Sequence, residues 1–146
     1  MTEVLIKRLS KNIELPKYET KGSSGMDLSA NIVNQIKIEP GKTSIIPTGI
    51  SVSIPKNFEI QIRSRSGLAA KSQISVLNSP GTIDADYRGE LKVILINLSN
   101  KTFIVERGTR IAQMVLSPIV KAKFKEVDNL DDTDRGAGGF GSTGLK

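Results

Sequence analysis

A segment in the middle of the chain combines the residue types that bind anions. It reads Arg63, Ser64, Arg65, Ser66 and Gly67, and it connects an expected strand to a short expected helix. The N-terminus of a helix presents unpaired backbone N–H groups and a partial positive charge. Because arginine and serine side chains stand beside that terminus, the segment predicts an anion site. The alternative is a solvated arginine pair with Ser66 as the helix cap.

The C-terminal segment offers a second set of anion-binding groups. Arg135 is a permanent cation, the glycines within 136–144 expose N–H groups that can approach a phosphate closely, and Ser142 and Thr143 add hydroxyl donors. Phe140 is bracketed by glycines, so its ring can cover a flat ligand. The glycines match G-x-G-x-x-G, but no apolar strand precedes them and no helix can follow. The segment predicts a lid that phosphate orders, with a disordered linker as the alternative.

A third segment carries two carboxylates that could activate water. If Asp84, Ala85 and Asp86 are extended, both carboxylates project from one face and Tyr87 from the other. Two like charges repel, so one of them needs a partner such as Arg88, or a proton, a metal or a water-filled site. An ionised carboxylate can orient or deprotonate a water molecule. The alternative is a polar hairpin rich in turn-forming residues.

Two polar residues interrupt apolar segments elsewhere. Asp27 lies between Met26 and Leu28 at an expected strand start, and Gln113 lies within the apolar segment 110–114. By themselves they are typical of a turn aspartate and of a hydrogen-bonded strand glutamine.

The composition limits what chemistry these residues can support. The 146 residues include no His, no Cys and no Trp. Disulfides, thiolate nucleophiles and imidazole bases are therefore excluded. Proton chemistry must come from carboxylates, Tyr, Lys or positioned water, and a metal would be a hard, oxygen-liganded ion such as Mg²⁺.

The net charge narrows the class of ligand. Lys and Arg total 21 against 15 Asp and Glu, which gives a net charge of +6 and favours anionic ligands. Aromatic residues are only 4 % of the chain, so few rings are present on which unpaired bases could stack. A small phosphorylated ligand fits the charge as well as nucleic acid does. With no secretory signal and no apolar stretch of about 20 residues, we expect a cytoplasmic protein without a membrane partner.

The elements that position these residues are expected to be strands. Ile and Val outnumber Ala, and segments 50–54 and 58–63 alternate apolar and polar residues with the period of a half-buried strand. Segment 93–96 is continuously apolar, which indicates a strand covered on both faces, by the opposing sheet and by another subunit. Turn signals at short spacing, such as 39–42 and 47–49, separate the strands. The pattern predicts one all-β barrel or sandwich domain.

One short helix is expected at 66–72, where Leu68, Ala69, Ala70 and Lys71 favour helix. The glycine density after residue 135 cannot hold a fixed fold alone. We therefore expect a β-barrel domain over 1–127 and a flexible C-terminal arm over 128–146 that becomes ordered when ligand binds.

Five segments, taken in order, resemble the motifs of the trimeric dUTP diphosphatase (dUTPase) family. They are spread over residues 24–144, nearly the whole chain, and although each is weak alone, the five in sequence at family-like spacing are specific. The matching segments are Ser24-Gly25-Met26-Asp27-Leu28, Arg65-Ser66-Gly67-Leu68-Ala69, Gly81-Thr82-Ile83-Asp84-Ala85-Asp86-Tyr87-Arg88-Gly89-Glu90, Arg110-Ile111-Ala112-Gln113-Met114 and Arg135-Gly136 through Gly144.

The resemblance implies a homotrimer of jelly-roll-like β subunits that uses Mg²⁺ to hydrolyse dUTP to dUMP and pyrophosphate. It implies that Asp84 orients the attacking water with help from Gln113, and that Asp27 meets Mg²⁺ through water. Tyr87 would lie against the sugar and exclude a 2′-OH, and Phe140 of a neighbouring subunit would cover uracil. The residues implied in substrate binding are Arg65, Ser66, Gly67, Asn78, Gly81, Tyr87, Arg135, Phe140, Gly141, Ser142 and Thr143.

One departure from the family pattern concerns the helix exit. Gln73 stands where a Gly often closes the short helix, and a left-handed backbone would strain a residue with a Cβ. Two other functions remain open at this stage. The first is a dCTP deaminase-like enzyme of the same fold, which would release ammonia. The second is a basic, non-enzymatic β module that binds nucleic acid with a steep salt dependence, although we expect no stable nucleic-acid binding.

Overall fold

The computed structural model describes residues 1–141, which form ten strands and one helix. All strand pairs in this part of the chain are antiparallel. The elements are β1 (Leu5–Arg8), β2 (Met26–Ser29), β3 (Ile36–Ile38), β4 (Thr43–Ser53), β5 (Phe58–Arg63), α1 (Ser66–Ser72), β6 (Ile74–Val76), β7 (Gly81–Ile83), β8 (Glu90–Asn97), β9 (Phe103–Val105) and β10 (Arg110–Pro118).

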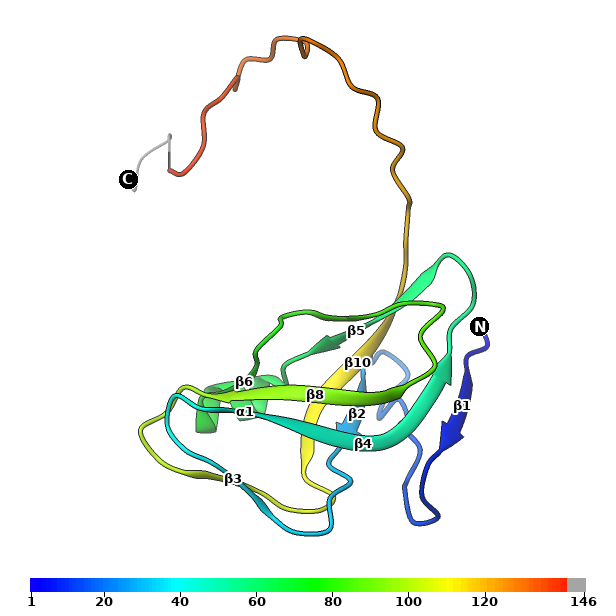
Figure 1. The fold of residues 1–146 in the computed structure, drawn as a ribbon, viewed down its shortest axis with the longest axis vertical. Coiled ribbons are helices and arrows are strands. Elements are labelled where there is room, and N and C mark those ends of the chain that lie inside the picture. Colours follow the sequence, from blue (N-terminus) through cyan, green and yellow to red (C-terminus); the bar gives the residue numbers. More distant parts are fainter. Residues whose placement is uncertain (142–146) are drawn as a thin grey trace.

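Two four-stranded sheets make up the body of the molecule (Figure 1). One has the order β1-β4-β8-β6 and the other the order β2-β10-β5-β7, while β3 and β9 form a small third sheet. Buried Ile, Leu and Val side chains from both large sheets form one core cluster. The predicted all-β, jelly-roll-like fold with one short helix is confirmed.

The alternating segments lie as their pattern predicts. In β5, Ile60 and Ile62 are buried while Arg63 is exposed, and in β8 Val93 and Leu95 are buried. The other face of β8 carries Ile94 and Ile96, which are only half-buried within one chain. Full cover of that face by another subunit stays a prediction.

Segment 47–49 is not the turn that its Pro and Gly suggest. It lies within the continuous strand β4, where the register with β8 shifts between Pro47 and Ser51. Gly49 takes a left-handed φ of +73°, which absorbs the irregularity as a β-bulge. Pro47 and Gly49 therefore form a bulge rather than a turn, because β4 pairs with β8 on both sides of them.

Both ends of α1 differ from a standard helix. The N-cap residue is Arg65, without a side-chain capping bond. Ser66 is already the first helical residue, so it is not the helix cap that the alternative to an anion site assigns to it. At the other end Gln73 has φ 50° and ψ 35°, the left-handed conformation in question, and its N–H donates to Ala69 O at 3.1 Å. Such a conformation costs a non-Gly residue about 1–2 kcal/mol.

Residues 119–141 leave the end of β10 and run away from the barrel without helix or strand (Figure 1). Val120 and Phe124 are almost completely exposed, as is Phe140. The division of the chain at residue 127 stays a prediction. Over residues 1–141, no helix has the length and apolar character needed to cross a membrane.

Candidate active site

Three polar residues form a row across the sheet β2-β10-β5. Asp27 of β2 pairs with Gln113 of β10, and Gln113 pairs on its other side with Arg63 of β5. Side chains of directly paired residues project from the same sheet face. The register therefore explains why two isolated polar residues, 86 positions apart in the sequence, belong to one site.

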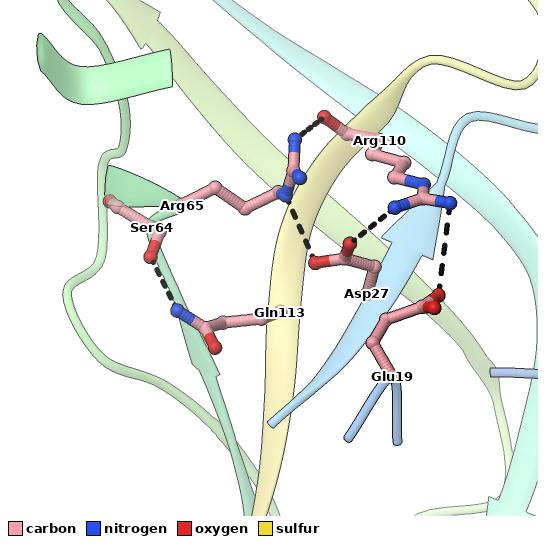
Figure 2. A network of polar contacts seen from close by, with 6 residues as sticks. All are labelled: Glu19, Asp27, Ser64, Arg65, Arg110 and Gln113. Carbon is pink, nitrogen blue, oxygen red and sulfur yellow. Dashed lines mark hydrogen bonds and ion pairs between the residues drawn. The ribbon is translucent and has the colours of Figure 1, made fainter. Parts of the chain in front are cut away.

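Asp27 lies between two arginines that it holds in place (Figure 2). Its Oδ1 accepts from Arg65 Nε at 2.9 Å, and its Oδ2 accepts from Arg110 Nη1 at 3.3 Å. Arg110 also pairs with Glu19 at 3.7 Å, and Arg65 Nη1 donates to the Arg110 carbonyl at 3.3 Å. Asp27 and Arg65 keep only 23 % and 30 % of their side-chain surface exposed, so the pair orders a guanidinium group at the start of α1.

Gln113 is held with its amide group in one orientation. Its Nε2 donates to Ser64 O at 3.0 Å, which leaves the Oε1 oxygen as an acceptor (Figure 2). A Cβ at Gly25 would lie 2.4 Å from that oxygen, so any other residue at position 25 would displace the amide from this orientation. Gln113 therefore presents a fixed hydrogen-bond acceptor on the same sheet face as Asp27.

The segment that enters α1 is also fixed by hydrogen bonds. Ser64 Oγ accepts from Val76 N at 2.9 Å and contacts Ser75 Oγ at 3.0 Å. Ser66 and Gly67, by contrast, are exposed at the start of the helix. The two serines therefore differ: Ser64 holds the turn by its hydrogen bonds, whereas Ser66 is exposed beside Arg65.

The segment after β7 is a turn, so the extended arrangement of its two carboxylates is wrong. Tyr87 N donates to Asp84 O at 3.1 Å, which reverses the chain at Ala85 and Asp86. Arg88 donates to the carbonyls of Ala85 and Tyr87 at 2.7 and 3.0 Å, so it braces the turn rather than pairing with a carboxylate. Asp84 is exposed, and its side chain makes no hydrogen bond or ion pair with the rest of residues 1–141.

Tyr87 packs against its own hairpin. Its hydroxyl donates to Glu90 O at 3.0 Å, and a Cβ at Gly89 would lie 2.3 Å from that hydroxyl oxygen. An open cleft of about 260 Å³ adjoins the ring. The residues that line it are Thr82, Ile83, Asp84, Tyr87, Glu90 and Lys92.

The structure brings the expected site residues together in two groups, which we call the arginine cluster (Asp27, Arg65, Ser66, Gly67 and Gln113) and the hairpin cleft (Asp84 and Tyr87). The pairing of β5 with β7 separates the arginine cluster from the hairpin cleft in space. Ile83 lies opposite Ile60, three residues before Arg63, a distance of about 10 Å along the strand. Because the strands are antiparallel, the chain moves away from Arg63 as it reaches Asp84.

Two further expected residues lie between these groups. Gly81 opens β7 opposite Ile62, and a Cβ placed on it would lie 3.2 Å from Asn78 Nδ2. Asn78 is exposed. Both are therefore placed on the hairpin, at the end of β7 nearer the arginine cluster.

Within residues 128–141, the described part of the C-terminal arm, no side chain forms a hydrogen bond or ion pair with either group. Arg135 Nε donates to Gly138 O at 2.9 Å, a contact within the arm itself. Phe140 and Gly141 have positive φ values of 51° and 84°, and both are exposed. The predicted Ser142 and Thr143 lie outside the described residues.

Several residues of the site had no role in the sequence interpretation. Arg110 and Glu19 complete the ion pairs around Asp27, while Gly25 and Gly89 leave room for Gln113 and Tyr87. The sequence signal for the two glycines is their place in the family-like segments 24–28 and 81–90, which carries no statement of what they do. Glu19 carries no such signal, because its contact depends on how the segment before β2 folds back.

A metal ion has only limited protein ligands here. Within residues 1–141, no three acidic, His or Cys side chains converge as a metal cage. Asp27 is a single carboxylate with both oxygens already in ion pairs. This donor set fits Mg²⁺ held chiefly by phosphate and water oxygens, the usual way in which Mg²⁺ binds with nucleotides.

An all-β domain with fixed arginines, an exposed helix start and a separate carboxylate is of the class that binds and acts on phosphorylated small molecules. The model of the dUTPase family matches residues 11–144. The chain belongs to the dUTPase family.

Individual relatives agree with this assignment. The chain is similar to the deoxyuridine 5′-triphosphate nucleotidohydrolase of Rickettsia bellii (strain OSU 85-389), with 55 % identity over 146 residues that cover 99 % of this chain and 97 % of the relative. The Fusobacterium nucleatum enzyme of the same name is 52 % identical, with 99 % of each chain covered.

Solved structures show the same fold. A variant of the dUTPase of Staphylococcus bacteriophage 80alpha with dUpNHpp gives a TM-score of 0.88 at 27 % identity, covering 99 % of this chain and 100 % of that one. A dUTPase variant from phage phi11, described for its coordination of a structural Mg(II) ion, gives 0.77 at 24 % identity, covering 87 % and 97 %.

Proposed function

We propose that this chain carries out the reaction of its family, the hydrolysis of dUTP to dUMP and pyrophosphate, at sites shared between the subunits of a homotrimer. The main support for a shared site is that the arginine cluster and the hairpin cleft are separated within one chain. Water activation by Asp84 and phosphate binding by Arg65 must act on one nucleotide. One chain places Arg65 beyond the end of β5 and Asp84 beyond the end of β7, and the antiparallel pairing of these strands separates those two ends. A hairpin cleft brought by one subunit to the arginine cluster of another resolves the conflict.

The reaction requires a positioned water rather than a covalent nucleophile. The water oxygen attacks the α-phosphorus, the bond from that phosphorus to the α,β-bridging oxygen breaks, and pyrophosphate leaves. Asp84 orients the water and accepts its proton, since its carboxylate has no partner in the described chain to compete for it. The fixed Oε1 of Gln113 accepts the water's second hydrogen.

The arginine cluster and the C-terminal arm bind the phosphate groups. Arg65, held by Asp27 at 2.9 Å, and the exposed N–H groups of Ser66 and Gly67 meet the triphosphate oxygens. Arg135 adds a second guanidinium group from a neighbouring subunit's arm, with Gly141, Ser142 and Thr143 at the γ-phosphate. Charge neutralisation and positioning supply most of the catalysis in such phosphoryl substitutions.

Mg²⁺ is the ion that this donor set fits, with Asp27 meeting it through water. When bound with the nucleotide, it neutralises charge on the phosphate oxygens. The phi11 dUTPase with its structural Mg(II) ion supports the choice of metal.

Base and sugar are selected on the hairpin. Asn78, with the backbone at Gly81, contacts the uracil edge, and the Tyr87 ring lies against the deoxyribose, where a 2′-OH would collide with it. Phe140 of the arm covers the base. The nucleotide is thereby enclosed between two of the few aromatic rings in the chain.

The specificity predicts a clear order of rates. With Mg²⁺ present, pyrophosphate release from dUTP is expected to exceed release from dTTP, dCTP and UTP by at least about a hundredfold, because each competitor meets a clash or an unpaired polar group. Steady-state assays of the four nucleotides at equal concentration test this. Equal rates on all four would contradict the proposed specificity, and ammonia from dCTP would support a deaminase instead.

A shared site predicts complementation between two inactive variants. Asp84→Asn and Arg65→Ala trimers should each be nearly inactive. When the two chains are co-expressed and assemble at random, about a quarter of the sites combine an intact Asp84 with an intact Arg65 from different subunits. Mixing the two preformed trimers without subunit exchange is the control.

The outcome separates the two site models. Recovery towards a quarter of wild-type activity is expected only if the two residues come from different chains. No recovery in mixed trimers of verified composition would place the site within one chain. The comparisons give no support to the deaminase or to the nucleic-acid-binding module, and a cytoplasmic location stays a prediction.

A further inference from the structure

The bulge in β4 is closed by a side chain from the base of the Tyr87 hairpin. Thr48, Gly49 and Ile50 stand opposite a single residue of β8, Leu91. The Gly49 N–H has no partner in the strand ladder and donates to Glu90 Oε1 at 2.9 Å. Thr48 Oγ1 donates to Leu91 O at 2.6 Å in a buried contact. The Glu90 carboxylate therefore substitutes for the backbone acceptor that the bulge removes.

The bulge itself cannot move to accommodate a change at Glu90. Leu9 N donates to Gly49 O and Asn31 N to Pro47 O, each at 2.8 Å. A Cβ at Gly49 would lie 2.1 Å from Ile13 Cδ1 and 2.5 Å from Asn31 Nδ2. The bulge is thus held by Leu9, Ile13 and Asn31, and it offers Glu90 a donor that is fixed in place.

The main chain of Glu90 positions the Tyr87 ring. Its carbonyl accepts the Tyr87 hydroxyl hydrogen at 3.0 Å, and the ring covers Gly89, where a Cβ would lie 2.3 Å from the hydroxyl oxygen. Tyr87 is 43 % exposed, and this exposed part of its surface faces the hairpin cleft and solvent. The position of the ring thus depends on where the Glu90 carbonyl lies.

We propose that Glu90 is a positioning residue for sugar selection: its carboxylate, bound to the bulge of β4, fixes the carbonyl that holds the Tyr87 ring in the path of a 2′-OH. This inference rests on the proposed function, because it assigns a cause to the discrimination between dUTP and UTP. Glu90 need not touch the nucleotide. It acts through a chain of two hydrogen bonds, from Gly49 to its side chain and from Tyr87 to its backbone.

The charge of Glu90 offers a competing explanation. Glu90 also lines the hairpin cleft with Asp84 and Lys92, so its negative charge could act on the catalytic carboxylate directly. The two explanations separate on substitution by Gln, which removes the charge but keeps an oxygen that accepts from Gly49 N–H.

The test measures kcat and KM for dUTP and for UTP in the wild-type protein and in four full-length variants. Glu90→Ala is expected to lower the ratio of the two kcat/KM values about tenfold, as loss of a charge-assisted hydrogen bond allows, while Glu90→Gln stays within about twofold of wild type. Tyr87→Phe, which keeps the ring but loses the hydroxyl donor, should lower the ratio as Glu90→Ala does. Combining Tyr87→Phe with Glu90→Ala should add little, because both break the same chain of contacts.

The results distinguish this inference from the function on which it rests. An unchanged ratio in both Glu90→Ala and Tyr87→Phe would overturn the inference, and so would a Gln variant as defective as the Ala variant. Tyr87→Phe keeps the test decisive if Glu90→Ala fails to fold. Absence of pyrophosphate release from dUTP in wild-type protein would instead overturn the proposed function.

Discussion

Asp84→Asn is expected to lower turnover of dUTP by about a thousandfold, the scale of a lost general base, while nucleotide binding remains. Asparagine has nearly the same shape as aspartate but cannot accept the proton of the attacking water. Asp84 is exposed, and its side chain bonds to no other part of residues 1–141, so the fold has no contact to lose. The loss should therefore appear in kcat rather than in stability.

Single-turnover pyrophosphate release and titration with dUpNHpp measure the two effects separately. Asp86→Asn is the matched control, because Asp86 is an exposed carboxylate in the same turn and has no role in the proposed reaction. Near-normal turnover of the Asp84 variant would remove Asp84 from the mechanism. Equal losses in both variants would indicate a general effect of charge at the hairpin.

Removal of residues 135–146 is expected to leave a folded trimer that has lost about a hundredfold or more in kcat/KM, the scale of one lost donor to developing charge. The barrel should be unaffected, because no contact in the described structure joins Arg135 or Phe140 to it. The nucleotide loses one guanidinium group and the ring that covers its base.

Size-exclusion chromatography with light scattering, thermal unfolding and steady-state kinetics test the three parts of this prediction. A chain shortened only by Leu145 and Lys146 is the control, since it keeps the residues assigned to the nucleotide. Full activity without residues 135–146 would contradict the role of the arm as a lid. Loss of the trimer would show that the arm also takes part in assembly.

The strands could be predicted from the sequence where burial on one face dictates alternation, as in β5 with Ile60 and Ile62. The bulge of β4 could not, since Pro47 and Gly49 are equally suited to a turn, and only the pairing with β8 decides between them. Likewise, the Asp84 turn depends on hydrogen bonds from Tyr87 and Arg88 that no local pattern specifies. Long-range pairing decided the first case, and local hydrogen bonds within residues 84–88 decided the second.

The sequence predicted which residues belong to the candidate site, but it did not predict how they are arranged in space. Asp27 and Gln113 carry no individual signal, and the motifs of the family named them before the strand register placed them side by side. The ion pairs of Arg110 with Asp27 and Glu19 were not predicted, because contacts between distant segments leave no trace in local sequence, although Arg110 lies in the same family-like segment as Gln113. The separation of Asp84 from Arg65 also follows only from the β5–β7 register.

The separation of Arg65 and Asp84 within one chain also makes the catalytic activity depend on the protein concentration. Under the proposed arrangement, a lone chain carries the components of a site but no complete one. Activity per chain should therefore fall on dilution below the dissociation constant of the trimer, although each barrel remains folded. Newly made chains would stay inactive towards dUTP until they meet two others, so the rate of assembly sets when activity begins.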